Sequence, residues 1–380
     1  MSVPGSVAPL NPRAQVGAKS QASPHANNFD LIRLAAALQV LYVHCASHFD
    51  TLGRDRALST LIALFPGVPV FFFISGFLLS KSFERNSNWR EYAWNRALRI
   101  YPALLVCFLL SLIAFWQCGF FAGRQVPGGQ FVAWVIAQLT IGQFYNPAFI
   151  SHAPMRALNG SVWTISVELQ FYLLLPLLYR LPGFAGAPRR ANFILVAMIA
   201  VFLLASRLWP WTDPGLGGAL APQIPATLFV PWFYMFLVGV LFQRNSQFLK
   251  RWLAGRFRYV FITYCALAFV AVRELHWTLM DAPQPVLFLG LALVTYAAAF
   301  STPRLSERLL RRNDLSYGLY LYHAPVISVL LLTGFPDGHA ALWAVLATSI
   351  ALAYASWILI EKPAMAFKRH PLYTHQPAGA

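Results

Sequence analysis

Long apolar segments recur along the whole chain and constrain its fold more than any other feature of the sequence. Ten of them approach the roughly 20 residues that an α-helix needs to cross a bilayer. Of the 380 residues, 58% are hydrophobic and only 11% are charged, which excludes a soluble domain of this size. The sequence predicts an all-α polytopic membrane protein with about ten transmembrane helices in one bundle. The ten segments are 30–50, 62–80, 100–117, 161–179, 191–206, 224–243, 259–272, 284–300, 315–333 and 341–360.

An eleventh segment, 131–147, is ambiguous because it contains two glutamines and an asparagine. The distribution of charge distinguishes ten crossings from eleven. With ten crossings and a cytoplasmic N-terminus, about 23 of the 29 Lys and Arg residues lie on the cytoplasmic side, as the positive-inside rule expects. Eleven crossings would turn the later basic loops outward. We therefore predict ten crossings with both termini cytoplasmic, and we expect 131–147 to lie along the outer interface or to re-enter the bundle.

The remaining composition indicates one membrane domain and no soluble one. We expect a disordered cytoplasmic tail over 1–28, a membrane domain over 29–364 and a cytoplasmic tail over 365–380. The net charge of +16 does not indicate a nucleic-acid partner, because Lys and Arg fall in short clusters between apolar segments. The four cysteines form no C-x-x-C pair and receive no redox or metal role. In "GVPVFFFISGFLLS", Gly67, Ser75 and Gly76 are expected to let helices pack closely.

Arg33 and His44 are notable because a charge or a titratable ring inside hydrocarbon is costly. Eleven residues separate them, which is close to three helical turns, so they share one helix face with His44 about 16 Å beyond Arg33. We expect this face to look into the bundle, where His44 has either a functional role or a packing role. His48 lies one turn further, but no third ligand of suitable spacing completes a metal site, and no metal is predicted.

Glu168 and His323 are placed in depth by the same helical rise. Glu168 is expected at nearly the height of His44, in the outer half of the membrane, whereas His323 is expected about 12 Å from the cytoplasmic side. Glu168 suits either function or a structural pair with a neighbouring helix. His323, beside Tyr320 and Tyr322, also suits a hydrogen-bonded core position.

Arg96 and Arg99 are three residues apart and share one helix face at a cytoplasmic entrance. They suit the binding of a phosphate or carboxylate, although topology alone also explains cytoplasmic arginines. Glu361 ends the last apolar segment on the same side, and a carboxylate is unfavourable at a helix C-terminus. An arginine partner is therefore expected for it, with Arg33, Arg96 and Arg99 as the candidates.

Six stretches in this order resemble the membrane acyltransferase-3 family, integral-membrane O-acyltransferases of bacterial glycans. They are "FDLIR" followed by His44, "GVPVFFFISGFLL", "RALRIYP", "SVWTISVELQFYLLLPLL", "LSYGLYLYHAPV" and "IEKP". Together they cover 29–364. Pro69 stands where many family members have Asp, which leaves that position without an expected role.

The resemblance implies an enzyme that transfers an acyl group, commonly acetyl, from cytoplasmic acyl-CoA to a carbohydrate hydroxyl, in the bacterial inner (plasma) membrane. It implies functional roles for Arg33, His44, Arg96 and Arg99. We expect the three arginines to bind coenzyme A phosphates and His44 to act as general base or as acyl carrier.

Further site residues complete this hypothesis. Glu168 is expected to orient His44 if their helices are adjacent. His323, Trp163 and Tyr322 are expected substrate contacts, and membrane lipid is an expected partner. Two alternatives remain at this stage. A multi-span transporter or flippase of glycan precursors also uses buried charges, although no duplicated halves are evident. A scaffolding subunit would need no chemistry at His44.

Overall fold

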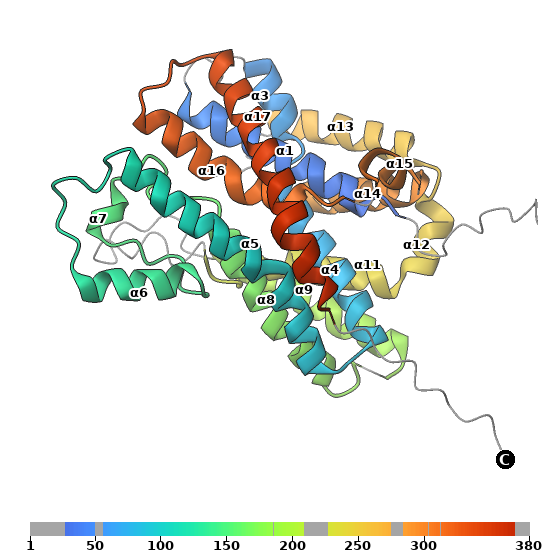
Figure 1. Ribbon diagram of the computed structural model, residues 1–380. Coiled ribbons are helices and arrows are strands. Elements are labelled where there is room, and N and C mark those ends of the chain that lie inside the picture. The colour runs from blue at the N-terminus through green and yellow to red at the C-terminus, as the bar shows by residue number, and fades with distance from the viewer. Residues whose placement is uncertain are drawn as a thin grey trace, which may run out of the picture.

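The computed structural model describes residues 27–49, 56–184, 186–208, 227–274, 284–302, 304–311 and 313–368. Every regular element in these ranges is a helix (Figure 1). The helices are α1 (Phe29–His48), α3 (Arg56–Ala63), α4 (Gly67–Arg85), α5 (Trp89–Gln117), α6 (Gly128–Gln138), α7 (Ala148–Ser151), α8 (Trp163–Arg180), α9 (Pro188–Leu208), α11 (Phe233–Arg244), α12 (Ser246–Leu253), α13 (Phe257–Arg273), α14 (Pro285–Ser301), α15 (Leu305–Leu310), α16 (Ser316–Leu332), α17 (His339–Ser356), the π-helix η1 (Trp357–Glu361) and α18 (Lys362–Ala366).

The predicted all-α membrane architecture is confirmed. Each of the ten predicted apolar segments contains a helix. In the described ranges, five helical stretches are long and apolar enough to cross a bilayer on their own, and α12 with α13, bent by 88°, would add a sixth. The number of ten crossings stays a prediction. The five stretches are Phe29–His48, Leu58–Arg85, Trp89–Gln117, Pro188–Leu208 and His339–Ala366.

The ambiguous segment 131–147 contains a short helix followed by a turn. Its helix, α6, has 11 residues and covers about 16 Å, roughly half of the hydrocarbon thickness. The chain then turns, and the Ile141 carbonyl accepts a hydrogen bond of 2.7 Å from Ser166 in α8. This contact holds the turn against the bundle, and both alternatives for 131–147, re-entry and the outer interface, stay predictions.

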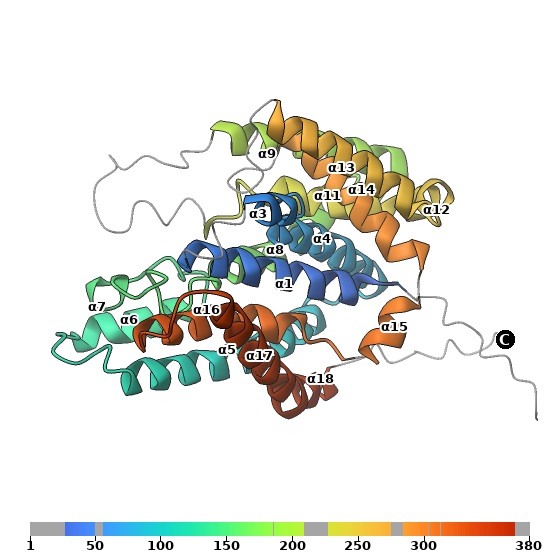
Figure 2. The ribbon, with the colours of Figure 1, turned by 90° about the horizontal axis from the view of Figure 1, so that it is seen from above.

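Helix α1 lies between two groups of helices. Figure 2 shows α5, α16 and α17 on one side of α1, and α4, α11 and α14 on the other. A residue on α1 can therefore contact both groups. Arg33 contacts Asp314 directly before α16, and His44 contacts His323 in α16, so both side chains face the bundle.

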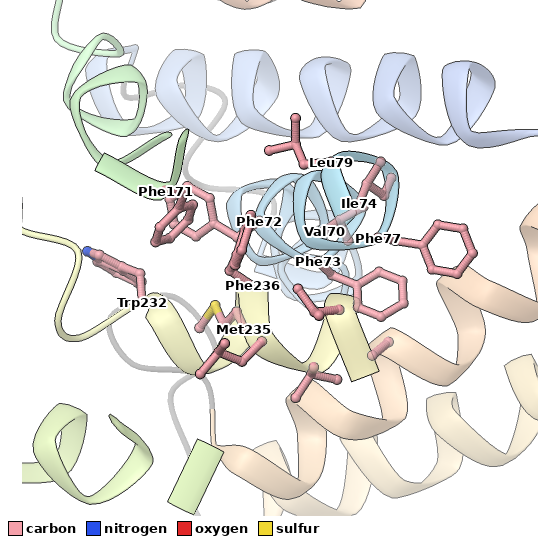
Figure 3. Close-up of a cluster of buried hydrophobic side chains, with 14 of the residues drawn as sticks. Val70, Phe72, Phe73, Ile74, Phe77, Leu79, Phe171, Trp232, Met235 and Phe236 are labelled. Carbon is pink, nitrogen blue, oxygen red and sulfur yellow. The ribbon is translucent and has the colours of Figure 1, made fainter. Parts of the chain in front are cut away.

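Helices α4 and α11 cross closely. A Cβ atom on Gly76 would overlap the Phe236 carbonyl oxygen, and one on Gly239 would overlap the Phe73 carbonyl oxygen. Aromatic side chains fill the space around the crossing, as Figure 3 shows for Phe72, Phe73 and Phe236. Gly67 is equally confined, against the Ala36 carbonyl oxygen of α1. The predicted packing role of Gly67 and Gly76 is confirmed.

The membrane domain begins slightly before the predicted boundary. Asn28 is 2% exposed, and its side chain donates hydrogen bonds to the carbonyl oxygens of Ala298 and Thr302 at the end of α14. It also accepts a hydrogen bond from the backbone of Ser306. The first residue of the fold is therefore within the range expected as a tail. Most of the two predicted tails, residues 1–26 and 369–380, lies outside the described residues.

Candidate active site

A cavity of about 110 Å³ lies between α1, α4, α5, α8 and α16. This volume is large enough for several water molecules or a short acyl group. Three arginines, Arg33, Arg96 and Arg99, line one end, which we call the basic end. Along α8 the lining continues from Tyr172 to Thr164, about 12 Å away. The cavity therefore runs along the bundle from a cationic end towards the interior.

Asp314 organises the basic end. Its carboxylate lies 2.5 Å from an Arg99 nitrogen and 3.3 Å from an Arg33 nitrogen. Burial alone would raise the pKa of Asp314, but the guanidinium groups of Arg99 and Arg33 outweigh it and hold the pKa well below its usual value. Asp314 also accepts hydrogen bonds from the backbone and hydroxyl of Ser316, in the first turn of α16. The three charges form one network.

Glu361 joins this network through Arg99, at 3.5 Å. Its other oxygen accepts a hydrogen bond from Ser356. Of the three arginine partners predicted for Glu361, the structure selects Arg99. Helix α17 continues here as the π-helix η1, whose last residue is Glu361. The Glu361 residue is buried, with 2% of its surface exposed.

Arg96 differs from the other two arginines. It forms no salt bridge with a described residue, and its Nε atom is buried without a hydrogen-bond partner among those residues. Its guanidinium lies 6.0 Å from the Tyr172 ring centre. Lys368 approaches from beyond α18, and burial together with Arg96, Arg99 and Arg33 lowers its pKa to about 8. Arg33 also forms a salt bridge with Asp30, so Arg96 is the arginine of the basic end without a salt-bridge partner among the described residues.

His44 pairs with His323 across the α1–α16 contact. The His44 Nδ1 and His323 Nε2 atoms lie 2.9 Å apart, and the two rings are tilted by 31°. His323 is fully buried, and its Nε2 also lies 3.1 Å from the Ser161 hydroxyl. The predicted heights of the two histidines differ by only about 4 Å, which allows this contact, but no contact between them was predicted.

The hydrogen bonds of His323 fix the proton positions on both rings. Its Nδ1 lies 3.1 Å from the Leu319 carbonyl oxygen, which can only accept, so Nδ1 carries the proton. In neutral His323 the Nε2 atom is then an acceptor, and His44 donates to it through Nδ1. Neutral His44 therefore has its lone pair on Nε2. This is the tautomer that a histidine base uses when a second group holds its Nδ1 proton.

Tyr320 and Thr164 connect the cavity to the histidine pair. Both line the cavity, and their hydroxyl groups are 2.6 Å apart. The Tyr320 hydroxyl also lies 3.1 Å from the Ser161 carbonyl oxygen, and its ring packs edge-on against His323 at 5.7 Å. Tyr320 and Thr164 therefore contact both the cavity and the residues around His323.

Glu168 does not join His44. Its carboxylate accepts hydrogen bonds from Ser75, at 3.1 Å, and Tyr172, at 2.7 Å, in the wall of the cavity. The predicted role of Glu168 as the partner that orients His44 is therefore replaced by His323. Equal depth in the membrane did not imply contact, because α16 rather than α8 supplies the neighbour of His44.

The other predicted site residues lie outside the cavity lining. Trp163 packs its ring against Trp232 at 5.3 Å, and Tyr322 is buried with its hydroxyl near Ser356. His48 turns its Nδ1 to the His44 carbonyl oxygen, at 2.9 Å. The described ranges contain no group of three or more His, Cys, Asp or Glu side chains that could hold a metal ion.

Two residues of the site were missed at the level of sequence. Asp314 could have been noticed as an acid directly before α16, at the end of the bundle where three arginines need a counter-charge. Ser161 gave no signal, because a serine before a helix is ordinarily a capping residue. Only the fold places it beside His323.

Comparison with known proteins adds independent findings. The acyltransferase domain family matches residues 27–361. Nodulation protein 10 of Rhizobium leguminosarum bv. viciae is 32% identical over 373 residues, covering 90% of this chain and 94% of that protein. The O-acetyl transferase of Shigella phage Sf6 is 26% identical over 345 residues, covering 88% of this chain and 95% of that protein. Acyltransferase MdmB of Streptomyces mycarofaciens is 31% identical over 153 residues, covering 40% of this chain and 38% of that protein. No solved structure matches the chain.

Proposed function

Because this chain belongs to the acyltransferase family and is an O-acyltransferase, we propose that its donor is an acyl-CoA and its acceptor a carbohydrate hydroxyl. Acetyl is the first candidate for the acyl group, since the similar phage protein is an O-acetyl transferase. One observation carries the proposal. The cavity has three arginines at one end, one of them without a described salt-bridge partner, and its other end is lined by Tyr320, which packs against His323 beside His44.

The basic end suits the phosphate groups of coenzyme A. Arg33 and Arg96 each have a buried Nε atom without a partner among the described residues, and a phosphate oxygen would satisfy both atoms. Arg99 forms salt bridges with Asp314 and Glu361, so we assign it a structural role at the basic end. We assign the strongest donor contact to Arg96, because no described carboxylate competes for it.

The thioester would then extend along the cavity towards His44. The distance from Arg33 to His44 along α1 is about 16 Å. This is the direction in which the cavity leads, past Tyr172 and Glu168 towards Thr164 and Tyr320. A rearrangement of the Tyr320 and Thr164 side chains would give the acyl group access to His44.

We propose His44 Nε2 as the general base. It takes the proton of the sugar hydroxyl while the oxygen attacks the thioester carbonyl carbon. The carbon–sulfur bond then breaks, the ester forms, and the imidazolium returns the proton to the departing thiolate. His323 holds the Nδ1 proton throughout, so His44 stays in the tautomer that can accept at Nε2. A covalent acyl-histidine intermediate uses the same nitrogen.

The proposal includes an orientation in the membrane. The basic end faces the cytoplasm, where acyl-CoA is available, and the histidine pair lies towards the outer face of the bacterial inner membrane. The membrane acyltransferase domain then extends from Asn28, one residue before the predicted start, to residue 364, with both chain ends cytoplasmic. The excess of Lys and Arg on the cytoplasmic side supports this orientation.

An acyl-transfer assay tests the proposed function. Purified protein in vesicles receives acetyl-CoA labelled in the acetyl group on its basic side, with a panel of oligosaccharides on the other side. We expect label on a sugar hydroxyl and release of free coenzyme A in equal amounts. Movement of a sugar across the vesicle without labelling would support a transporter and contradict the proposal.

A further inference from the structure

A second hollow lies on the outside of the bundle, between α5 and α8. It has a volume of about 450 Å³ and is lined on the α5 side by small and aromatic side chains, including Ala93, Ala97 and Tyr101. On the α8 side, Leu173 and Leu177 are 66% and 52% exposed. In a membrane, these leucines contact hydrocarbon. We call this hollow the α5–α8 groove.

The two ends of the α5–α8 groove differ in chemistry. Trp89 and Arg180 line the end at the basic side of the protein, and both are exposed. Tryptophan and arginine are the residues expected where hydrocarbon meets lipid headgroups. None of the residues that line the groove is acidic. An occupant with a negative headgroup and an apolar chain is therefore complementary to it.

The length of the α5–α8 groove sets the size of the apolar part. From Trp89 to Tyr101 along α5 the helix rises about 18 Å, slightly more than half of the hydrocarbon thickness. The turn at Thr140 and Ile141 lines the far end, beside Leu169. The groove therefore fits a chain that spans one leaflet, and it does not continue for a longer polyprenyl chain.

We propose that the α5–α8 groove binds one acyl chain of an anionic glycerophospholipid, with the lipid phosphate at Arg180. The bound lipid also supports the catalytic cavity. Arg96 and Tyr172 line both the cavity and the groove, so the chain packs against the outer side of the wall that they form. This lipid site is separate from the donor and acceptor positions of the proposed function.

Native mass spectrometry of the purified full chain tests this site, with dipalmitoyl phosphatidylglycerol as the probe and phosphatidylcholine of the same chains for comparison. We expect phosphatidylglycerol to bind more tightly than phosphatidylcholine. Arg180→Gln should weaken it about fivefold, the value of one cationic contact at a membrane surface. Ala97→Trp should fill the groove and weaken both lipids.

Matched controls distinguish the groove from general charge and bulk. Arg189→Gln removes another exposed arginine at the start of α9, and Ala200→Trp adds bulk to an exposed position of α9; neither lines the groove. Both should bind phosphatidylglycerol as the wild type does. A phosphatidylglycerol that carries a diazirine in its chain should label 93–101 and 169–177 in the unmodified protein.

Several outcomes would overturn the lipid site. These are equal affinity for the two headgroups, equal loss in the variants and their controls, labelling confined to other helices, and displacement of phosphatidylglycerol by a polyprenyl phosphate at equal concentration. His44→Ala should bind phosphatidylglycerol normally. Failure of the lipid site and failure of the proposed transfer reaction are therefore distinguishable.

Discussion

His44 Nδ1 donates a hydrogen bond to His323 Nε2 over 2.9 Å, although 279 residues separate the two histidines in the chain. Because the Leu319 carbonyl oxygen fixes the proton of His323 on Nδ1, the pair has one consistent proton arrangement, with the lone pair of His44 on Nε2. A neutral histidine thus takes the place that a carboxylate occupies in a Ser-His-Asp triad. A neutral partner is less costly than a charge in the interior of a membrane bundle.

His323 is predicted to act as a positioning residue for His44. His323→Leu removes the acceptor of the His44 proton, and we expect kcat to fall roughly 10²-fold while the KM for acyl-CoA changes less than about twofold. His323→Gln keeps an acceptor oxygen and should recover part of kcat. Steady-state kinetics of the two variants checks this. Equal kcat in both variants, or a change confined to KM, would show that His323 has no such role.

Arg96 and Arg99 are predicted to have different roles although they lie one turn apart. Arg96→Gln should raise the KM for acyl-CoA about tenfold, because a charge-assisted contact to phosphate is lost. Its thermal unfolding midpoint should stay unchanged. Arg99→Gln should lower the midpoint, because it leaves Asp314 and Glu361 without their shared cation. Donor kinetics and unfolding curves in detergent separate the two effects, and the reverse pattern would contradict both assignments.

Asp314 is predicted to make the free energy of unfolding depend on pH. Its pKa is lower in the folded protein than in the unfolded chain, so it contributes stability above the unfolded value, about 3.9, and loses it as the pH falls towards the folded value. The wild type should therefore lose stability as the pH falls below about 5. Asp314→Asn should be about 3 kcal/mol less stable at pH 7, and its curve should be flatter in this window. Unfolding midpoints from pH 3.5 to 7 measure both; parallel curves for the two proteins would contradict the assignment.

The α4–α11 crossing gives a prediction about packing. Gly76→Ala should destabilise the protein by about 1–3 kcal/mol, because the new methyl group overlaps the Phe236 carbonyl oxygen, which belongs to the backbone and cannot rotate away. Gly128→Ala, at the open start of α6, is the matched control and should be neutral. Thermal unfolding in the same detergent compares them. A Gly76→Ala protein as stable as the control would mean that the helices cross less closely.

Local features of the fold were predictable from sequence, whereas contacts between distant helices were not. The apolar segments located the helices, and the small residues Gly67 and Gly76 located close approaches, because both signals depend on neighbouring residues alone. The number of crossings did not follow from the apolar segments, because several apolar helices have too few residues to span the hydrocarbon core of a bilayer. These are α11, α14 and α16.

The site was predicted in its components but only partly in their arrangement. Depth along an ideal helix put Glu168 at nearly the height of His44 and His323 about 4 Å lower, yet the order of the helices made His323 the neighbour of His44. Similar heights do not identify neighbours in a bundle of helices. Asp314 was missed because a charge in a basic loop has no periodic pattern that marks it as buried.

Acyl transfer by the His44→Ala variant tests the central claim most directly. Wild type, His44→Ala and the conservative His44→Gln are inserted in equal amounts, and each is given labelled acetyl-CoA with the acceptor that the wild type modifies. We predict that both variants lose transfer by at least about 10²-fold while the KM for acyl-CoA, where it can be measured, stays near the wild-type value. Transfer by His44→Ala at close to the wild-type rate would contradict the role of His44 as base or acyl carrier.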